Sequence, residues 1–113
     1  MLKVGIDSIG FYTSHYALDL ASLAEARGID VEKFHIGLGQ HRMGVTAPGE
    51  DIVTLAANAG LRALRHTDTD SIEMLLFATE SGIDQSKSAG IYVYHLLGLS
   101  EKCRVIELKQ ACY

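Results

Sequence analysis

The sequence has 113 residues, of which 48% are apolar and 21% are charged, and it contains a single proline, Pro48. This composition is typical of a folded globular domain and excludes a disordered or fibrous chain. The formal net charge of -4 comes without any basic cluster, so we expect no nucleic-acid partner.

The amino-terminal residues 2–12 combine apolar side chains with glycines at positions 5 and 10, which predicts a first strand that bends or is approached closely by another backbone. This stretch has no cationic leader and no long apolar run, so we expect a cytoplasmic chain without a signal peptide or membrane span. A helix is predicted next, from the candidate N-cap Asp19 to Gly28, and then a short helical turn over residues 30–34.

The middle of the sequence contains a loop and the longest predicted helix. Residues 37–49 are rich in glycine and include Pro48, which favours a loop. Residues 51–65 carry an apolar stripe that Val53 and Leu64 widen. We therefore expect this helix to be buried on more than one side.

A strand–helix–strand unit follows. Residues 74–78 are continuously apolar, residues 86–97 have helical length and end at Gly98, and residues 104–108 alternate as a strand. A helical crossover joins parallel strands of one sheet, and it brings their carboxyl ends to the same edge. The predicted fold class is therefore α/β.

Two reactive side chains follow the ends of these strands. Glu80 comes two residues after the first strand and Cys112 four residues after the second. Ligands of open α/β sheets bind beyond the carboxyl ends of the strands, and a thiol beside a carboxylate suits acyl transfer. Position alone leaves open the alternative that Glu80 is a solvated charge and Cys112 an unreactive thiol.

Other residues that often bind metals or nucleotides lack the required spacing. Cys103 and Cys112 form no CxxC pair, and the five histidines show no paired-ligand pattern, so we expect neither a metal site nor a disulfide framework. Gly37 and Gly39 lack the third glycine of a dinucleotide fingerprint, which favours a tight turn.

Five short motifs occur in order along the sequence. They are Glu25-Ala26-Arg27, Ile36-Gly37-Leu38-Gly39-Gln40, Glu50-Asp51-Ile52-Val53, Thr79-Glu80-Ser81 and Ala111-Cys112-Tyr113. Together they resemble the 3-hydroxy-3-methylglutaryl-CoA (HMG-CoA) synthase family, in its bacterial form. The resemblance implies a thiolase-like α/β fold with a layered αβαβα architecture and a mixed sheet. Residues 1–113 would be its amino-terminal portion, truncated just after the nucleophilic cysteine.

The resemblance also implies a chemistry. Cys112 would accept an acetyl group from acetyl-CoA, and Glu80 would act as general acid and base in a Claisen-type condensation with acetoacetyl-CoA. Water would then release HMG-CoA, a precursor of isoprenoids in the mevalonate pathway. The CoA thioesters are substrates, so no cofactor is implied, and the full-length acyltransferase would be a homodimer.

A further motif of the family, which touches the CoA-linked substrate, falls on residues 30–34. It makes Asp30 and Val31 substrate-binding candidates, although Asp30 also suits a helix N-cap and Val31 plain packing. The sequence departs from the family at Thr13-Ser14, where relatives have a proline that would stiffen the loop.

Alternatives remain open at this point. A ketoacyl synthase of the same fold, or a polyketide branching enzyme that uses acyl carrier protein, would share the cysteine and the glutamate. The catalytic histidine of the family lies beyond Tyr113, so we expect the segment alone to be inactive. Half of a layered domain would also expose apolar surface, and the segment would then aggregate or associate with a complementary half.

Overall fold

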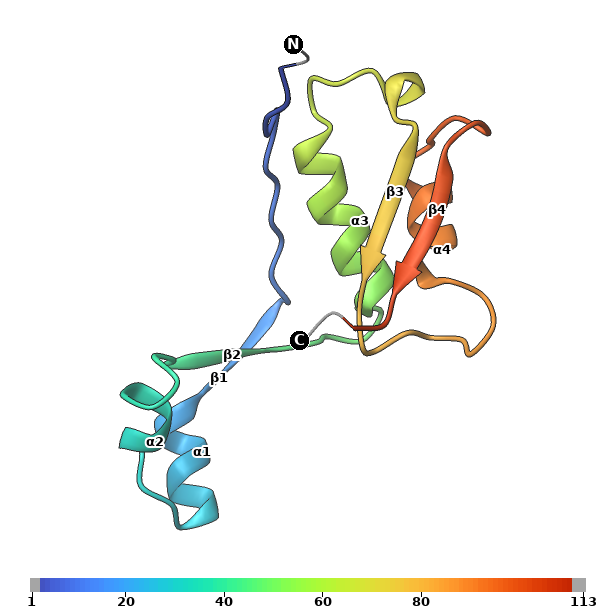
Figure 1. Ribbon diagram of the computed structural model, residues 1–113. Helices are drawn as coiled ribbons and strands as arrows, with labels where there is room; N and C mark the ends of the chain where they lie inside the picture. The colour runs from blue at the N-terminus through green and yellow to red at the C-terminus, as the bar shows by residue number, and fades with distance from the viewer. Residues whose placement is uncertain (1–2, 111–113) are drawn as a thin grey trace. The chain divides into compact units, whose positions relative to one another are not determined.

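The computed structural model describes residues 3–110 and divides the chain into two compact units (Figure 1). The larger unit contains residues 3–12 and 51–110, and the smaller one contains residues 13–50. Cys112 lies outside the described residues. No helix in residues 3–110 is long and apolar enough to cross a membrane.

The larger unit is built around a parallel pair of strands. Strand β3 spans Met74–Ala78 and strand β4 spans Arg104–Leu108, with Met74 opposite Arg104 and Ala78 opposite Leu108. Both strands and their parallel pairing are confirmed as the sequence predicted them.

Helix α4, Ala89–Leu96, connects the two strands. It begins three residues later than the predicted start at Ser86, because the Ser88 hydroxyl accepts a hydrogen bond from the Gly90 amide at 3.0 Å and so caps the helix. At its other end Gly98 adopts a left-handed φ of 61°, which confirms the predicted stop.

Helix α3, Ile52–Ala63, precedes the parallel unit and is confirmed as the longest helix. It starts with a capping box in which the Asp51 carboxylate accepts from the Thr54 amide at 2.8 Å and the Thr54 hydroxyl oxygen accepts from the Asp51 amide at 2.9 Å. A short 3₁₀ turn, η1 over Thr69–Ser71, then leads to β3.

Helices α3 and α4 lie on one side of the β3–β4 pair (Figure 1). Their contact surface forms one hydrophobic cluster, which includes Val53 and Ala57 from α3, Phe77 from β3 and Val93 from α4. The thiol of Cys103 is free and is buried in the same cluster. This core holds the carboxyl ends of both strands in a fixed relation to α4.

The predicted strand over residues 2–12 is wrong for the part that the structure describes. Residues 3–12 pair with no other described strand, and Val4 is 94% exposed. The glycine prediction holds at Gly10, where an added Cβ would collide with the backbone of Ala59 and Ala63 in α3. The Ser8 hydroxyl also donates to the Ala63 carbonyl at 2.7 Å, so this segment covers a second side of α3.

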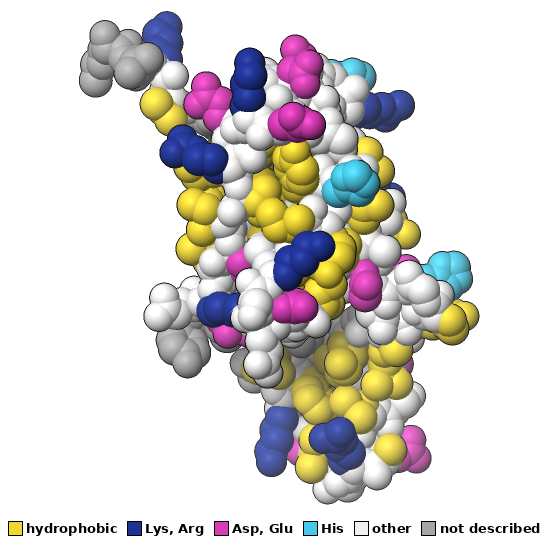
Figure 2. Space-filling model, turned by 90° about the vertical axis from the view of Figure 1, so that its right-hand side faces the viewer, with side chains coloured by type: hydrophobic (Ala, Val, Ile, Leu, Met, Phe, Trp, Pro, Cys, Tyr) yellow, Lys and Arg dark blue, Asp and Glu magenta, His cyan; other side chains and the backbone are white. Residues whose placement is uncertain are grey.

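The opposite face of the β3–β4 pair is apolar and open. Met74, Leu76, Ile106 and Leu108 project from it, and Leu76 is 57% exposed. Figure 2 shows hydrophobic side chains reaching the surface between charged ones on the face that it views. The expected exposure of apolar surface is thus confirmed, and it includes a face of the sheet as well as Leu61 on α3.

The smaller unit is an antiparallel hairpin with two helices. Strand β1, Tyr16–Asp19, pairs with β2, Arg42–Val45, and between them lie α1, Leu20–Arg27, and α2, Glu32–His35. The Asp19 cap and the Gly28 stop of α1 are confirmed. The prediction that residues 37–49 are entirely loop is wrong, because β2 forms there by pairing with β1.

A carboxylate ties the ends of this unit together. Glu50 accepts hydrogen bonds from the Ala47 amide at 2.8 Å and from the His15 amide at 3.0 and 3.1 Å. These amides, Ala47 first, lower the pKa of Glu50 from its ordinary value of 4.5.

Candidate active site at the ends of the parallel strands

The parallel ladder continues one step beyond its last paired residues. The Thr79 amide donates to the Leu108 carbonyl at 3.0 Å, which locks the exits of β3 and β4 side by side. Glu80 follows Thr79 at the exit of β3, and Lys109 follows Leu108 at the exit of β4. The predicted convergence of the two strand ends is therefore confirmed.

Glu80 lies exposed in a bend directly after this hydrogen bond. It lines a polar hollow of about 470 Å³ together with Lys109 and the following loop residues Gly82, Ile83, Asp84 and Gln85. The predicted partner Cys112 follows Leu108 by four residues, outside the described part of the chain. The structure thus places one of the two catalytic candidates in a hollow at the predicted edge.

The loop that carries Glu80, residues 79–88, is held by local hydrogen bonds, and we call it the Glu80 loop. The Thr79 hydroxyl oxygen accepts from the Ser81 amide at 3.0 Å. The Asp84 carboxylate accepts from the Lys87 and Ser86 amides at 2.8 and 2.7 Å, and these bonds lower the pKa of Asp84. The loop is therefore an ordered connection between β3 and α4.

A carboxylate that the sequence analysis did not single out lies on the neighbouring strand. Glu107 forms an ion pair with Lys109 at 2.5 Å and accepts from the Ala89 amide, the first residue of α4, at 2.5 Å. Lys109 and then Ala89 lower the pKa of Glu107. Strand alternation offered a signal, because Glu107 shares with Val105 the face of β4 that packs toward α4.

The two substrate-binding candidates belong to the smaller unit. The Asp30 carboxylate accepts from the Glu32 amide at 2.9 Å at the start of α2, and Val31 is half-buried at the same helix end. The N-cap of α2 is Val31 and it has no side-chain capping bond, so the expected N-cap role of Asp30 is wrong, although its carboxylate still bonds the first residue of the helix from one position earlier. One carboxylate oxygen suffices for that contact, so the residue keeps acceptor capacity for a ligand.

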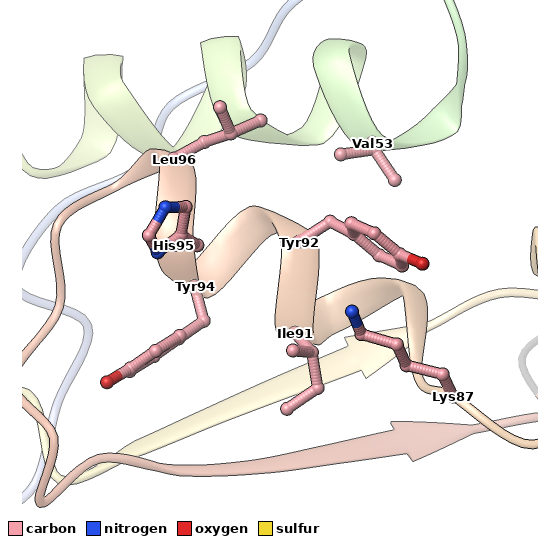
Figure 3. Close-up of a pocket in the computed structure, with 7 residues that line it drawn as sticks. All are labelled: Val53, Lys87, Ile91, Tyr92, Tyr94, His95 and Leu96. Carbon is pink, nitrogen blue, oxygen red and sulfur yellow. The ribbon is translucent and has the colours of Figure 1, made fainter.

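A second hollow, of about 370 Å³, lies beside α4 (Figure 3). Lys87 Nζ lies 3.9 Å from the centre of the Tyr92 ring, and both side chains line this hollow. Its lining contains no cysteine and no carboxylate, as the labelled side chains in Figure 3 show. It therefore lacks the groups that acyl transfer needs.

No group of three metal-binding side chains occurs within residues 3–110. His35 and His41 stack with their ring centres 4.2 Å apart, a ring contact in the smaller unit.

The fold is similar to those of solved HMG-CoA synthases. A crystal structure of an HMG-CoA synthase complexed with CoA superposes with a TM-score of 0.88 and 44% identity, over 99% of this chain and 29% of that one. The HMG synthase of the curacin biosynthetic pathway, solved with a holo donor acyl carrier protein, gives a TM-score of 0.84 and 39% identity, over 96% and 27%. The fold is accordingly thiolase-like, as the motifs implied.

The family follows from the sequence comparisons. The model described as "Hydroxymethylglutaryl-coenzyme A synthase N terminal" matches residues 2–113, and the chain belongs to this family. A hydroxymethylglutaryl-CoA synthase of Enterococcus faecalis is 45% identical over 99% of this chain and 29% of its own length. A polyketide biosynthesis 3-hydroxy-3-methylglutaryl-ACP synthase of Bacillus subtilis is 38% identical over 100% and 27%. The chain thus spans less than a third of these relatives.

Proposed function

We propose that this chain is the amino-terminal part of a synthase that condenses acetyl-CoA with acetoacetyl-CoA to give HMG-CoA. One observation carries the proposal: the Thr79–Leu108 hydrogen bond joins the two strand ends from which Glu80 and Cys112 follow. Four residues span at most about 14 Å, so the chain keeps Cys112 near this edge. Membership of the HMG-CoA synthase family supports the assignment.

The reaction would begin at Cys112. Its thiolate attacks the carbonyl carbon of acetyl-CoA, the carbon–sulfur bond to CoA breaks, and CoA leaves as a thiol after taking up a proton. The acetyl group is then held as a thioester on the enzyme. The second substrate would bind in the open hollow beside Glu80.

Glu80 would move the proton in the second step. Its carboxylate removes a proton from the acetyl methyl group, and the resulting enolate forms a carbon–carbon bond to the ketone carbon of acetoacetyl-CoA. The protonated Glu80 then returns the proton to the new alkoxide, giving the tertiary alcohol. Water finally cleaves the thioester to Cys112, which releases HMG-CoA and restores the thiol.

The test separates the roles of these two residues. In the full-length synthase, labelled acetyl-CoA should modify the peptide that contains Cys112, and Cys112→Ala should abolish this label. Glu80→Ala should still be acetylated while condensation falls about 10²- to 10⁴-fold, the range for a lost general acid–base. Unchanged labelling of Cys112→Ala would sink the proposal.

Asp30 and Val31 would contact the CoA-linked substrate. Asp30→Ala should raise KM for acetyl-CoA with little change in kcat, because a contact made equally in ground state and transition state affects binding alone. Asp30→Asn keeps an oxygen acceptor for the Glu32 amide and serves as the control for the contact with the start of α2. A fall in kcat at constant KM would contradict a binding role.

A second candidate uses acyl carrier protein in place of CoA. The similarity to the curacin synthase, solved with a donor acyl carrier protein, and to the 3-hydroxy-3-methylglutaryl-ACP synthase of Bacillus subtilis favours it. Acetylation rates of Cys112 with acetyl-CoA and with acetylated carrier protein distinguish the two. For the CoA-dependent enzyme we further propose a role in the mevalonate pathway and a homodimeric state, which sedimentation of the full-length protein would test.

A non-catalytic role, association through the open apolar face, is the remaining alternative. The exposed side chains of Leu76 and Ile106 favour it. A monomer whose mass is independent of concentration would count against it.

A further inference from the structure

The Glu107–Lys109 ion pair lies where three parts of the candidate site meet. The pair lies at the end of β4 and against Gly82 of the Glu80 loop, and its carboxylate accepts a hydrogen bond from the amide of Ala89, the first residue of α4. We propose that Glu107 is a positioning residue that fixes the Glu80 loop and α4 against the strand leading to Cys112. The inference rests on the proposed function, because it assigns Glu107 a role in the condensation step.

The burial of Glu107 is the first argument. Only 7% of its side chain is exposed, while that of Lys109 is 55% exposed. A carboxylate removed from water is costly unless its oxygens are bonded, and here one oxygen accepts from Ala89 and the other pairs with Lys109. In residues 3–110 no buried side-chain oxygen or nitrogen lacks a partner. The charge of Glu107 is therefore fully engaged in holding neighbouring elements.

The contact with the Glu80 loop is the second argument. A Cβ added at Gly82 would lie 2.6 Å from Lys109 Nζ and 2.9 Å from Glu107 Oε1. The loop backbone therefore passes directly against the ion pair, two residues after Glu80. Any larger residue at this position would have to displace the pair or the loop.

The position of Lys109 is the third argument. Lys109 directly follows the residue whose carbonyl accepts from Thr79, and it lines the same hollow as Glu80. Without Glu107 its ammonium would be free to change rotamer within that hollow. The ion pair thus fixes both the shape of the loop and the location of a positive charge beside the proposed base.

The test is made in the full-length synthase with Glu107→Gln. Glutamine keeps an oxygen acceptor for the Ala89 amide but loses the ion pair. We expect kcat for condensation to fall about 10- to 100-fold, the cost of a small misplacement of a reacting group. Acetylation of Cys112 by acetyl-CoA alone, and KM for acetyl-CoA, should change by less than about twofold. Glu101→Gln, on an exposed turn, removes a negative charge elsewhere and should leave both steps unchanged.

Two further variants separate positioning from general loss of structure. Glu107→Asp keeps the charge and should recover most of the lost rate. Gly82→Ala leaves both charged residues in place but inserts a methyl group between the loop and the ion pair, and it should slow condensation in the same selective way.

A double-mutant cycle with Glu80→Ala completes the test. If Glu107 acts through Glu80, adding Glu107→Gln to Glu80→Ala should cost less than about twofold further. The proposal would be overturned if the rate losses of the two single variants multiplied in the double variant, or if kcat were unchanged in Glu107→Gln. Amide exchange at Ser81 gives a readout independent of activity, because Glu107→Gln should accelerate it. An inactive wild type would refute the proposed function, and exchange at Ser81 would still decide whether Glu107 orders the loop.

Discussion

Helix α4 packs so closely on the sheet that one methyl group should destabilise the larger unit. Gly90 faces the strands, and a Cβ added there would lie 2.9 Å from Phe77 Cβ, 2.9 Å from Val105 Cγ1 and 3.1 Å from Ser88 Oγ. Phe77 Cβ is bonded directly to the backbone of β3, so it can move only with the strand. We expect Gly90→Ala to push α4 away from β3 and β4.

Two effects oppose each other in this variant. Overpacking of a tight core costs about 1–3 kcal/mol, whereas alanine gains at most about 1 kcal/mol over glycine in a helix. The cost of overpacking exceeds the gain in helix propensity, so the free energy of unfolding should fall by about 1–2 kcal/mol. For a domain of about 100 residues this lowers Tm by roughly 4–8 °C per kcal/mol.

Gly60→Ala in α3 is the matched control. Its added Cβ would meet the Leu97 methyl carbons Cδ1 and Cδ2 at 2.8 and 3.1 Å, and these can turn away by a small rotamer change. That adjustment costs about 0.5–1.5 kcal/mol, which the helix propensity of alanine largely offsets. Thermal unfolding followed by circular dichroism compares the two variants. Equal Tm values for Gly90→Ala and Gly60→Ala would refute the reasoning, because they would show that α4 retreats at no cost.

Three further predictions concern caps and surfaces. Asp51→Ala should lose about 1 kcal/mol in denaturant unfolding, the usual value of an N-cap. Because the Thr54 amide lowers the pKa of Asp51, the Asp51 carboxylate stabilises the fold above pH 3.8, and this stability is lost as the pH falls through the pKa of the folded state. The free energy of unfolding of Asp51→Asn should therefore depend less steeply on pH in acid than that of the wild type. Glu50→Gln should accelerate amide exchange in residues 13–50 at neutral pH, and in the wild type this protection should fall as pH drops below 4.5. Leu76→Lys should reduce self-association of residues 1–113 in light scattering more than Leu61→Lys does, and equal effects would show that the sheet face is not the contact.

The parallel unit was predictable because its signals are local. The apolar run of β3, the alternation of β4 and the Gly98 stop each specify an element without reference to the rest of the chain. The N-cap at Asp19 was predicted for the same reason, since a short acidic side chain before an apolar stripe favours an N-cap.

The errors occur where pairing with a distant segment decides the structure. The four residues of β2 are exposed and include Gly44, so their local pattern resembles a loop, and only pairing with β1 makes them a strand. Residues 3–12 show the converse, because a strand pattern yields no strand where no described partner lies alongside. The contacts of Glu107 could not be predicted for a related reason. They involve Lys109, Ala89 and Gly82, and no sequence motif indicates that these residues lie together in the fold.

The open face of the sheet and the candidate site adjoin one another at the carboxyl end of β3. Leu76 projects from the open face and is 57% exposed. Glu80 follows Leu76 by four residues and lies exposed in the bend where β3 has ended. A segment that covers Leu76 would then also border the substrate. Its burial would contribute about 25 cal/mol for each Å² of apolar surface and would exclude bulk water from the proposed acetyl thioester, so that stability and the proposed catalysis would depend on the same contact.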